Sequence, residues 1–180
     1  MPEDNSQMEV ARAFIAKSRS LLMTEYLPKI ERCVEKISDE DVWGRRGEQS
    51  NSIGNLILHL SGNARQWIVS GIGGAPDTRA RQSEFDQRSL IPRAELMARL
   101  NETLQEVDAV LSNLQPDRVL ERRIFQGTEE TIIDAVFHVV EHFSMHTGQI
   151  ILLTKMLSES DLRFYDFSSG VPRADWRRPE

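Results

Sequence analysis

The sequence is poor in three features: cysteine, positive charge and long apolar runs. Cys33 is the only cysteine, which excludes a disulfide framework and a cluster of metal-bound thiolates. No apolar run approaches the roughly 20 residues that span a bilayer, and the opening segment MPEDNSQME is acidic where a secretion signal is apolar. The net charge of −6 argues against nucleic acid, which attracts a concentrated basic face. We therefore expect a cytoplasmic protein that acts on a small molecule and binds neither nucleic acid nor a membrane.

Four amphipathic segments account for most of the chain. In each of them apolar residues recur at three- and four-residue steps, the spacing of one helix face. The predicted helices cover residues 7–38, 52–70, 93–114 and 131–158. Ser52 and Thr131 are predicted N-caps, and Asp134 completes a capping box with Thr131. Pro28 removes a backbone donor within the first segment, so we expect a single helix that bends there.

The segments between and after these helices differ in character. Residues 71–92 are charged and poor in apolar side chains, which predicts a surface crossover. The piece VLERRIFQG predicts a small extended turn around Gly127. Beyond residue 158 the periodicity ends, and the aromatic residues there suggest a tail that packs along the helices or on a second subunit.

Together these features predict the architecture. Four helices with short connections and one long one are typical of an all-α fold, a four-helix bundle with a long crossover between its second and third helices and an irregular C-terminal tail. The length fits a single domain over residues 1–180, with a core at about 7–158 and an extension at 159–180.

The chain has four histidines, and their positions are its most informative feature. A four-residue step on a helix returns a side chain to nearly the same face, as in His138, His142 and His146. His138 and His146 lie about 12 Å apart along the axis, too far to share one ion with bonds of roughly 2.0–2.1 Å. His142 and His146 continue the buried line of their helix, whereas His138 is rotated about 40° from it. We predict that His142 and His146 bind a metal with His59 from a facing helix, and that His138 lies at the helix edge or behind the ligands.

Several polar residues accompany these histidines. Asn55 and Asn63 flank His59 at four-residue steps, and Gln149 follows His146 by three. A polar group on an inward face costs about 1–3 kcal/mol unless it is paired. We therefore expect these side chains to orient the ligands or to contact a substrate. For Asn55 and Asn63, a solvent-facing position at the helix margin is the alternative, and no catalytic residue is predicted.

The segment NSIGNLILHLSGNARQWI, together with FHVVEHFSMHTGQIILLTKM later in the chain, resembles the DinB-like family of metal-binding four-helix bundles. That family includes bacillithiol-dependent transferases and mycothiol-dependent maleylpyruvate isomerases. The resemblance covers roughly residues 7–158, and its most specific part is the H-x-x-x-H-x-G-Q motif from His142 to Gln149. It implies that His59, His142 and His146 bind a divalent metal, most often zinc or nickel, with water in the remaining positions. It also implies a possible homodimer.

A site of this kind predicts chemistry. Three neutral imidazoles leave the charge of a divalent ion uncompensated, so the ion can lower the pKa of a bound water to about 7 or deprotonate a bound thiol. The sequence therefore predicts a metal-dependent hydrolase or a transferase that uses a low-molecular-weight thiol. The first alternative is a non-catalytic module in which the ion braces two helices, although structural sites normally have four protein ligands. The second is a plain helical bundle that acts through protein partners.

Overall fold

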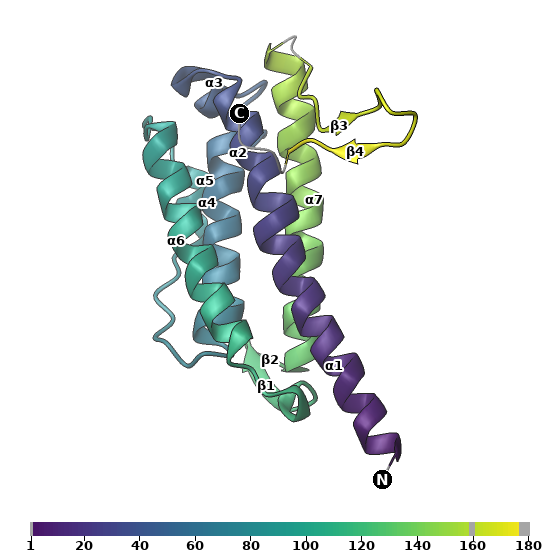
Figure 1. Cartoon of the computed structure of the whole chain (residues 1–180). Coiled ribbons are helices and arrows are strands. Elements are labelled where there is room, and N and C mark those ends of the chain that lie inside the picture. The colour runs from purple at the N-terminus through teal and green to yellow at the C-terminus, as the bar shows by residue number, and fades with distance from the viewer. Residues whose placement is uncertain (1, 159–160, 177–180) are drawn as a thin grey trace.

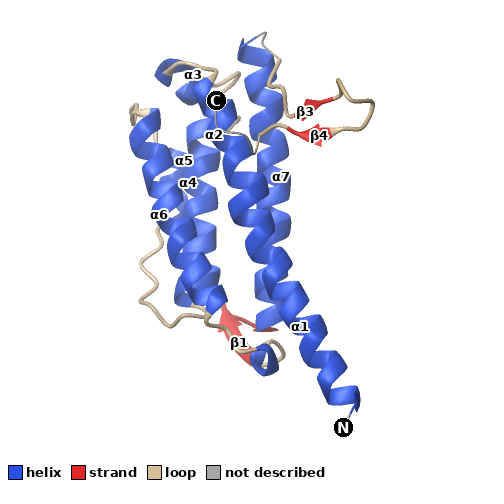
Figure 2. Ribbon diagram, viewed as in Figure 1, coloured by secondary structure: helices blue, strands red, loops and turns tan. Residues whose placement is uncertain are grey.

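The computed structural model describes residues 2–158 and 161–176, and this part of the chain is mostly helical (Figures 1 and 2). The helices, in chain order, are α1 (Pro2–Ser20), η1 (Leu21–Tyr26), α2 (Leu27–Glu35), α3 (Asp39–Trp43), α4 (Ile53–Ala64), η2 (Arg65–Ser70), α5 (Arg81–Asp86), α6 (Arg93–Ser112), η3 (Pro116–Arg118) and α7 (Ile132–Ser158). The strands are β1 (Arg122–Phe125), β2 (Thr128–Thr131), β3 (Tyr165–Asp166) and β4 (Arg173–Ala174). The predicted all-α class agrees with the predominance of helix, to which the structure adds two short strand pairs.

The first helical segment is continuous across Pro28, as predicted. The backbone widens into the π-helical turn η1 directly before α2, and Pro28 lies in the first turn of α2. Proline cannot donate a backbone hydrogen bond, and a π-helical turn is one way in which a helix accommodates an irregular hydrogen-bond pattern. The segment begins earlier than predicted, at Pro2.

The second helical segment begins where its sequence predicts. Ser52 caps α4, and its hydroxyl accepts a hydrogen bond from the backbone N–H of Asn55 over 3.1 Å. The side chain of Asn55 in turn accepts from the backbone N–H of Ser52, so that the two residues form a capping box. The segment then continues without a break through the π-helical η2 to Ser70.

The helices that carry the histidines are in direct contact. α4 packs against both α6 and α7, and α2 packs against α7. Fully buried side chains fill the space between them, among them Ile57 and Leu60 of α4, Leu104 of α6 and Phe143 of α7. The core therefore fixes one face of α4 against one face of α7. None of the described helices combines the length and the apolar character that a bilayer crossing needs.

The connection between α4 and α6 differs from its prediction as a surface crossover. It contains the short helix α5, which packs against α4 and buries Glu84 to an exposed fraction of 8%. The sequence does not reveal this contact, because it does not distinguish a charged residue that is buried with partners from one that is exposed to water.

The extended turn around Gly127 is confirmed. β1 and β2 pair antiparallel, and Gly127 lies between them with φ at +86°. That value lies in the left-handed region that glycine adopts without a steric cost. The hairpin leads directly into α7, whose N-terminus has the predicted capping box of Thr131 and Asp134.

The described part of the tail packs along the helices, one of the two arrangements predicted for it. β3 and β4 form a small antiparallel pair. Trp176 is buried, donates through its indole N–H to the carbonyl of Thr24 over 3.2 Å, and lies under the ammonium group of Lys29. Residues 159–160 and 177–180 of the predicted extension lie outside the described residues.

Two helical glycines give a matched test of this packing. A Cβ atom on Gly54 would lie 2.8 Å from the ring of Trp43, whereas a Cβ on Gly148 meets nothing within 4 Å. We expect Gly54→Ala to lower the free energy of unfolding by about 1–3 kcal/mol through overpacking, and Gly148→Ala to raise it by up to about 1 kcal/mol through helix propensity. Urea denaturation measures both. Equal effects of the two substitutions would contradict the close approach of Trp43 to α4.

Candidate metal centre

Three imidazole rings converge between α4 and α7. The Nε2 atom of His142 lies 3.1 Å from Nε2 of His59 and 3.1 Å from Nε2 of His146. One potential ligand atom from each residue lies within 4.8 Å of the other two. His142 and His146 are four residues apart on α7 and so share a face, while the packing of α4 on α7 brings His59 opposite them. The structure thus brings together the three histidines that the sequence proposes as ligands.

His138 lies one turn away from this cluster. Its Nε2 atom is 3.2 Å from the side-chain amide nitrogen of Asn63, and its ring lies against Trp67 with centroids 4.1 Å apart. It also stacks beside His142 at a centroid distance of 5.5 Å. His138 therefore contacts the cluster from behind, at the edge position that the phase of the helix predicts.

A buried carboxylate, which the sequence analysis missed, holds His59 in place. Oε2 of Glu84 lies 2.8 Å from Nδ1 of His59. Arg79 donates to the same carboxylate twice, through Nε to Oε1 over 2.7 Å and through Nη2 to Oε2 over 2.9 Å. A carboxylate that accepts from the outer ring nitrogen of a histidine fixes its tautomer and orientation, an arrangement found behind most metal-bound histidines.

Gly62 is the sequence signal that could have revealed this carboxylate. A Cβ atom at this position would lie 2.0 Å from Oε1 of Glu84 and 3.0 Å from Nε of Arg79. A glycine inside a helix carries an intrinsic cost of about 1 kcal/mol relative to alanine, so its presence points to a close approach. Here the bare backbone one turn after His59 admits the side chain of Glu84.

Hydrogen bonds on the far side of two rings set their tautomers. The ionised carboxylate of Glu84 can only accept, so Nδ1 of His59 is the donor in this pair, and in the neutral ring Nε2 then carries no proton. Nη2 of Arg79 also lies 3.1 Å from this Nδ1, but it donates to Oε2 of Glu84. Nδ1 of His146 likewise donates to Oε1 of Gln149 over 2.7 Å, which leaves its Nε2 bare. Two unprotonated nitrogens therefore face His142, whose single Nε2–H could be directed to only one of them. Nδ1 of His142 is itself buried and has no partner among the described residues. The hydrogen bonds of the protein thus leave at least one inward lone pair unsatisfied.

Burial favours the neutral form of the three histidines on α7. Burial, together with the nearby rings of His146 and His59, lowers the pKa of His142 to about 3. Burial also lowers the pKa values of His146 and His138. For Glu84, burial alone raises the pKa, but the hydrogen bonds from Arg79 and His59 outweigh it and bring the value below normal. At neutral pH His142 is therefore neutral, and an ionised carboxylate lies behind His59.

The two asparagines that the sequence predicts near His59 are both buried, but they lie in different surroundings. Asn55 is fully buried, accepts from Arg45 over 2.6 Å and donates to the backbone carbonyl of Glu84 over 2.7 Å. It therefore fastens α5 to α4 and does not contact the rings. Asn63 is also buried, so the solvent-facing alternative is wrong for both asparagines.

The residues of the cluster differ in exposure. Gln149 is exposed and His146 is half-buried, whereas His59 and His142 are buried. Of the three clustered rings, His146 is therefore the most exposed.

Comparison with known proteins gives a family but no activity. A family model with the description "Protein of unknown function (DUF1572)" matches residues 9–171, which include all four histidines as well as Arg79 and Glu84. No curated protein matches the chain.

The depressed pKa of His142 predicts a pH-dependent stability for the metal-free protein. Between about pH 3 and 6.5 the unfolded chain binds a proton that the folded ring does not, so the free energy of unfolding falls as the pH falls. From pH 7.5 to 5, His142 alone accounts for about 2 kcal/mol. Urea denaturation of chelator-treated protein at both pH values measures this difference. In His142→Asn the difference should shrink, and an unchanged pH dependence in that variant would contradict the buried neutral ring.

Proposed function

The chain belongs to the DUF1572 family, and we propose that it is a divalent-metal-dependent enzyme whose three-histidine site activates a water or a low-molecular-weight thiol. The observation that carries the proposal is the convergence of the Nε2 atoms of His59, His142 and His146. The hydrogen bond from His59 to Glu84 supports it, since this bond keeps the inward nitrogen of His59 free to bind a cation.

The donor set fits a transition metal. Two nitrogens that share a tetrahedral ion at roughly 2.05 Å lie about 3.3 Å apart. The two separations that involve His142 are 3.1 Å, and all three ligand atoms lie within 4.8 Å of one another. Neutral imidazole suits zinc and nickel, whereas magnesium and calcium prefer oxygen ligands. A cation would also satisfy the inward lone pairs that hydrogen bonds within the protein leave unpaired. We therefore propose zinc or nickel.

An open coordination position favours an enzyme over a brace. Structural zinc sites normally have four protein ligands, and the described residues offer three here. When bound, a divalent cation among three neutral imidazoles supplies Lewis-acid chemistry, which lowers the pKa of a coordinated water or thiol. Glu84 and Arg79 hold His59 in position, while burial keeps His142 neutral and available as a ligand. We propose that a small molecule approaches the cation from the side of His146, the most exposed of the three ligands.

The arrangement of the helices supports a relationship to the DinB-like proteins. We propose that residues 2–35, 53–70, 93–112 and 132–158 form the four-helix bundle of that fold. In this assignment the chain between η2 and α6 is the long crossover. The contacts of α4 with α6 and α7, and of α2 with α7, are those expected of such a bundle.

Metal content tests the site directly. We expect stoichiometric zinc or nickel in protein purified without a polyhistidine tag, measured by elemental analysis. His59→Ala and His142→Ala should lose the metal, because two ligands bind far more weakly than three. His138→Ala serves as the matched control, and it should retain the metal because this ring lies outside the cluster. A metal-free wild type whose melting temperature is unaffected by chelator would contradict the proposal and favour a plain helical protein.

A second readout separates an open site from a closed one. In protein loaded with cobalt(II), addition of 2-mercaptoethanol should produce a thiolate-to-cobalt absorption band, because a thiol that enters the open position is deprotonated there. A cobalt spectrum that stays unchanged, in protein that binds cobalt stoichiometrically, would favour the non-catalytic module.

The carboxylate behind His59 gives a separate test. We expect Glu84→Gln to weaken zinc binding by about 10- to 100-fold, the usual effect of removing such a partner. Gly62→Ala should act in the same direction, since its methyl group displaces the carboxylate while every ionisable group remains. Competition with a chromophoric chelator measures the affinities. Glu121→Gln is the control, because it removes an arginine-paired carboxylate at the surface. Equal affinities in Glu84→Gln and Glu121→Gln would show that Glu84 does not support the ligand.

A further inference from the structure

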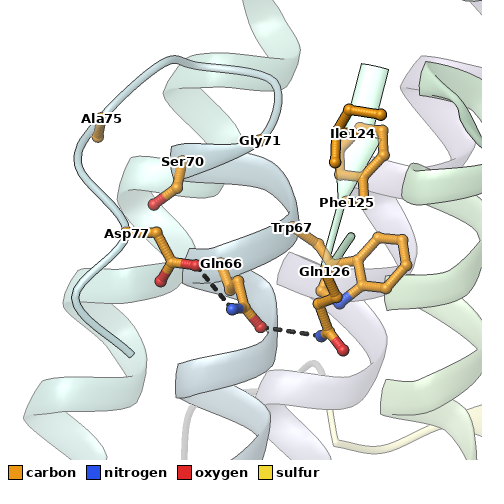
Figure 3. A pocket seen from close by; sticks show the side chains of 9 residues that line it. All are labelled: Gln66, Trp67, Ser70, Gly71, Ala75, Asp77, Ile124, Phe125 and Gln126. Atoms are coloured by element: carbon orange, nitrogen blue, oxygen red, sulfur yellow. Dashed lines mark hydrogen bonds between the residues drawn. The ribbon is translucent and has the colours of Figure 1, made fainter. Parts of the chain in front are cut away.

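A cavity lies between η2 and the β1–β2 hairpin, apart from the three clustered histidines (Figure 3). Its volume is about 200 Å³. The residues that matter for its chemistry are Gln66, Trp67 and Ser70 of η2, Asp77 of the crossover, and Phe125 and Gln126 of the hairpin. The proposed metal chemistry uses none of these six side chains.

The local fold builds this cavity from two elements that are far apart in sequence. Trp67 stacks on Phe125 with ring centroids 5.2 Å apart and an angle of 5° between the planes. Gly71 permits the approach, because a Cβ atom there would lie 2.5 Å from the Phe125 ring. The π-helical turn places Gln66, Trp67 and Ser70 along the same cavity, and such turns occur frequently at functional sites.

Trp67, which lines the cavity, has an unused hydrogen-bond donor. Its side chain is 6% exposed, and its indole N–H is buried without a partner. Figure 3 shows the indole nitrogen on the edge of the ring nearest Gln126. An unsatisfied buried donor costs about 1–3 kcal/mol, which a ligand oxygen at this point would recover. The cavity therefore favours a molecule with a hydrogen-bond acceptor.

Asp77 gives the opposite wall a negative charge. Its Oδ2 accepts from Gln66 over 2.7 Å and its Oδ1 from the backbone N–H of Arg79 over 3.0 Å, and each carboxylate oxygen can accept further bonds. The guanidinium groups nearby are already neutralised, that of Arg79 by Glu84 and that of Arg65 by Glu106. The cavity therefore attracts a cationic donor and repels anions.

We propose that this cavity is a second ligand site, which binds a small primary amine that also carries a carbonyl or hydroxyl oxygen. The ammonium group pairs with Asp77, and the oxygen accepts from the indole N–H of Trp67. The site goes beyond the proposed metal chemistry and uses none of the three proposed ligands.

Glycinamide is the probe, because it joins an ammonium group to an amide oxygen in five heavy atoms. In 15N-labelled protein the three tryptophans give three indole signals, and the signal of Trp67 is the one that Trp67→Phe lacks. Glycinamide should shift the Trp67 signal with a Kd on the order of 1 mM, a value within reach of so small a ligand. Acetamide, which lacks the amine, and glycolate, which is an anion, should leave this signal unchanged at the same concentrations.

Substitution of Asp77 tests whether its carboxylate binds the amine. Asp77→Asn should weaken glycinamide binding by about tenfold or more, since it removes a charge-assisted hydrogen bond. Asp77 is exposed, so this variant keeps the fold. Asp86→Asn is the matched control, because it removes one charge from the same crossover outside the cavity, and its affinity should equal that of the wild type. An unshifted Trp67 signal, an equal response to glycolate, or equal affinities in Asp77→Asn and Asp86→Asn would each overturn the proposal.

Discussion

The hydrogen bond between Glu84 and His59 is the interaction on which the candidate metal centre depends. It joins the crossover to α4, and it sets the tautomer in which the inward nitrogen of His59 is free. A buried carboxylate is costly on its own, and Arg79 offsets that cost with two hydrogen bonds. The side chain of Asn55 donates to the backbone carbonyl of Glu84, and it also accepts from Ser52 in the capping box of α4. The capping box, the crossover and the histidine cluster are thus one connected polar network.

Without a cation, this network leaves polar atoms unsatisfied at its centre. The inward nitrogens of His59 and His146 point toward His142, and burial opposes the protonation of His142 and His146. A protein under selection for stability alone gains nothing from such a cluster, because apolar residues of similar volume fill a core at lower cost. Unsatisfied polar atoms of this kind are typical of sites that bind a ligand.

The sequence predicts the parts of this structure that repeat or that depend on local rules. Apolar spacing locates the long helices, and serine or threonine at the right offset locates the caps at Ser52 and Thr131. Helix geometry is regular enough that the phase of His142 and His146 identifies the pair that faces α4. The buried roles of Glu84 and Arg79 escape this reasoning, because the crossover has no periodicity and the partner of Glu84 lies 25 residues away. The π-helical turns also have no pattern of their own. In the sequence, Gly62 and Gly71 are the local signs that Glu84 and Phe125 approach the helix backbone closely.

These two glycines connect the metal centre and the second cavity physically. Gly62 admits Glu84 against α4, and Gly71 admits Phe125 against η2, so that both surroundings are built on one continuous helical segment. Gln66 lies between them: it accepts from Gln126 over 2.8 Å and from Arg79 over 2.9 Å. Arg79 contacts Glu84, and Glu84 contacts His59, so three hydrogen bonds lead from Gln66 to Nδ1 of His59. Hydrogen bonds in a chain of this kind polarise one another in a medium of low dielectric constant. If occupancy of the cavity alters the bonds of Gln66, the change reaches a ligand of the proposed metal, and thermodynamic linkage requires the effect to operate equally in the reverse direction.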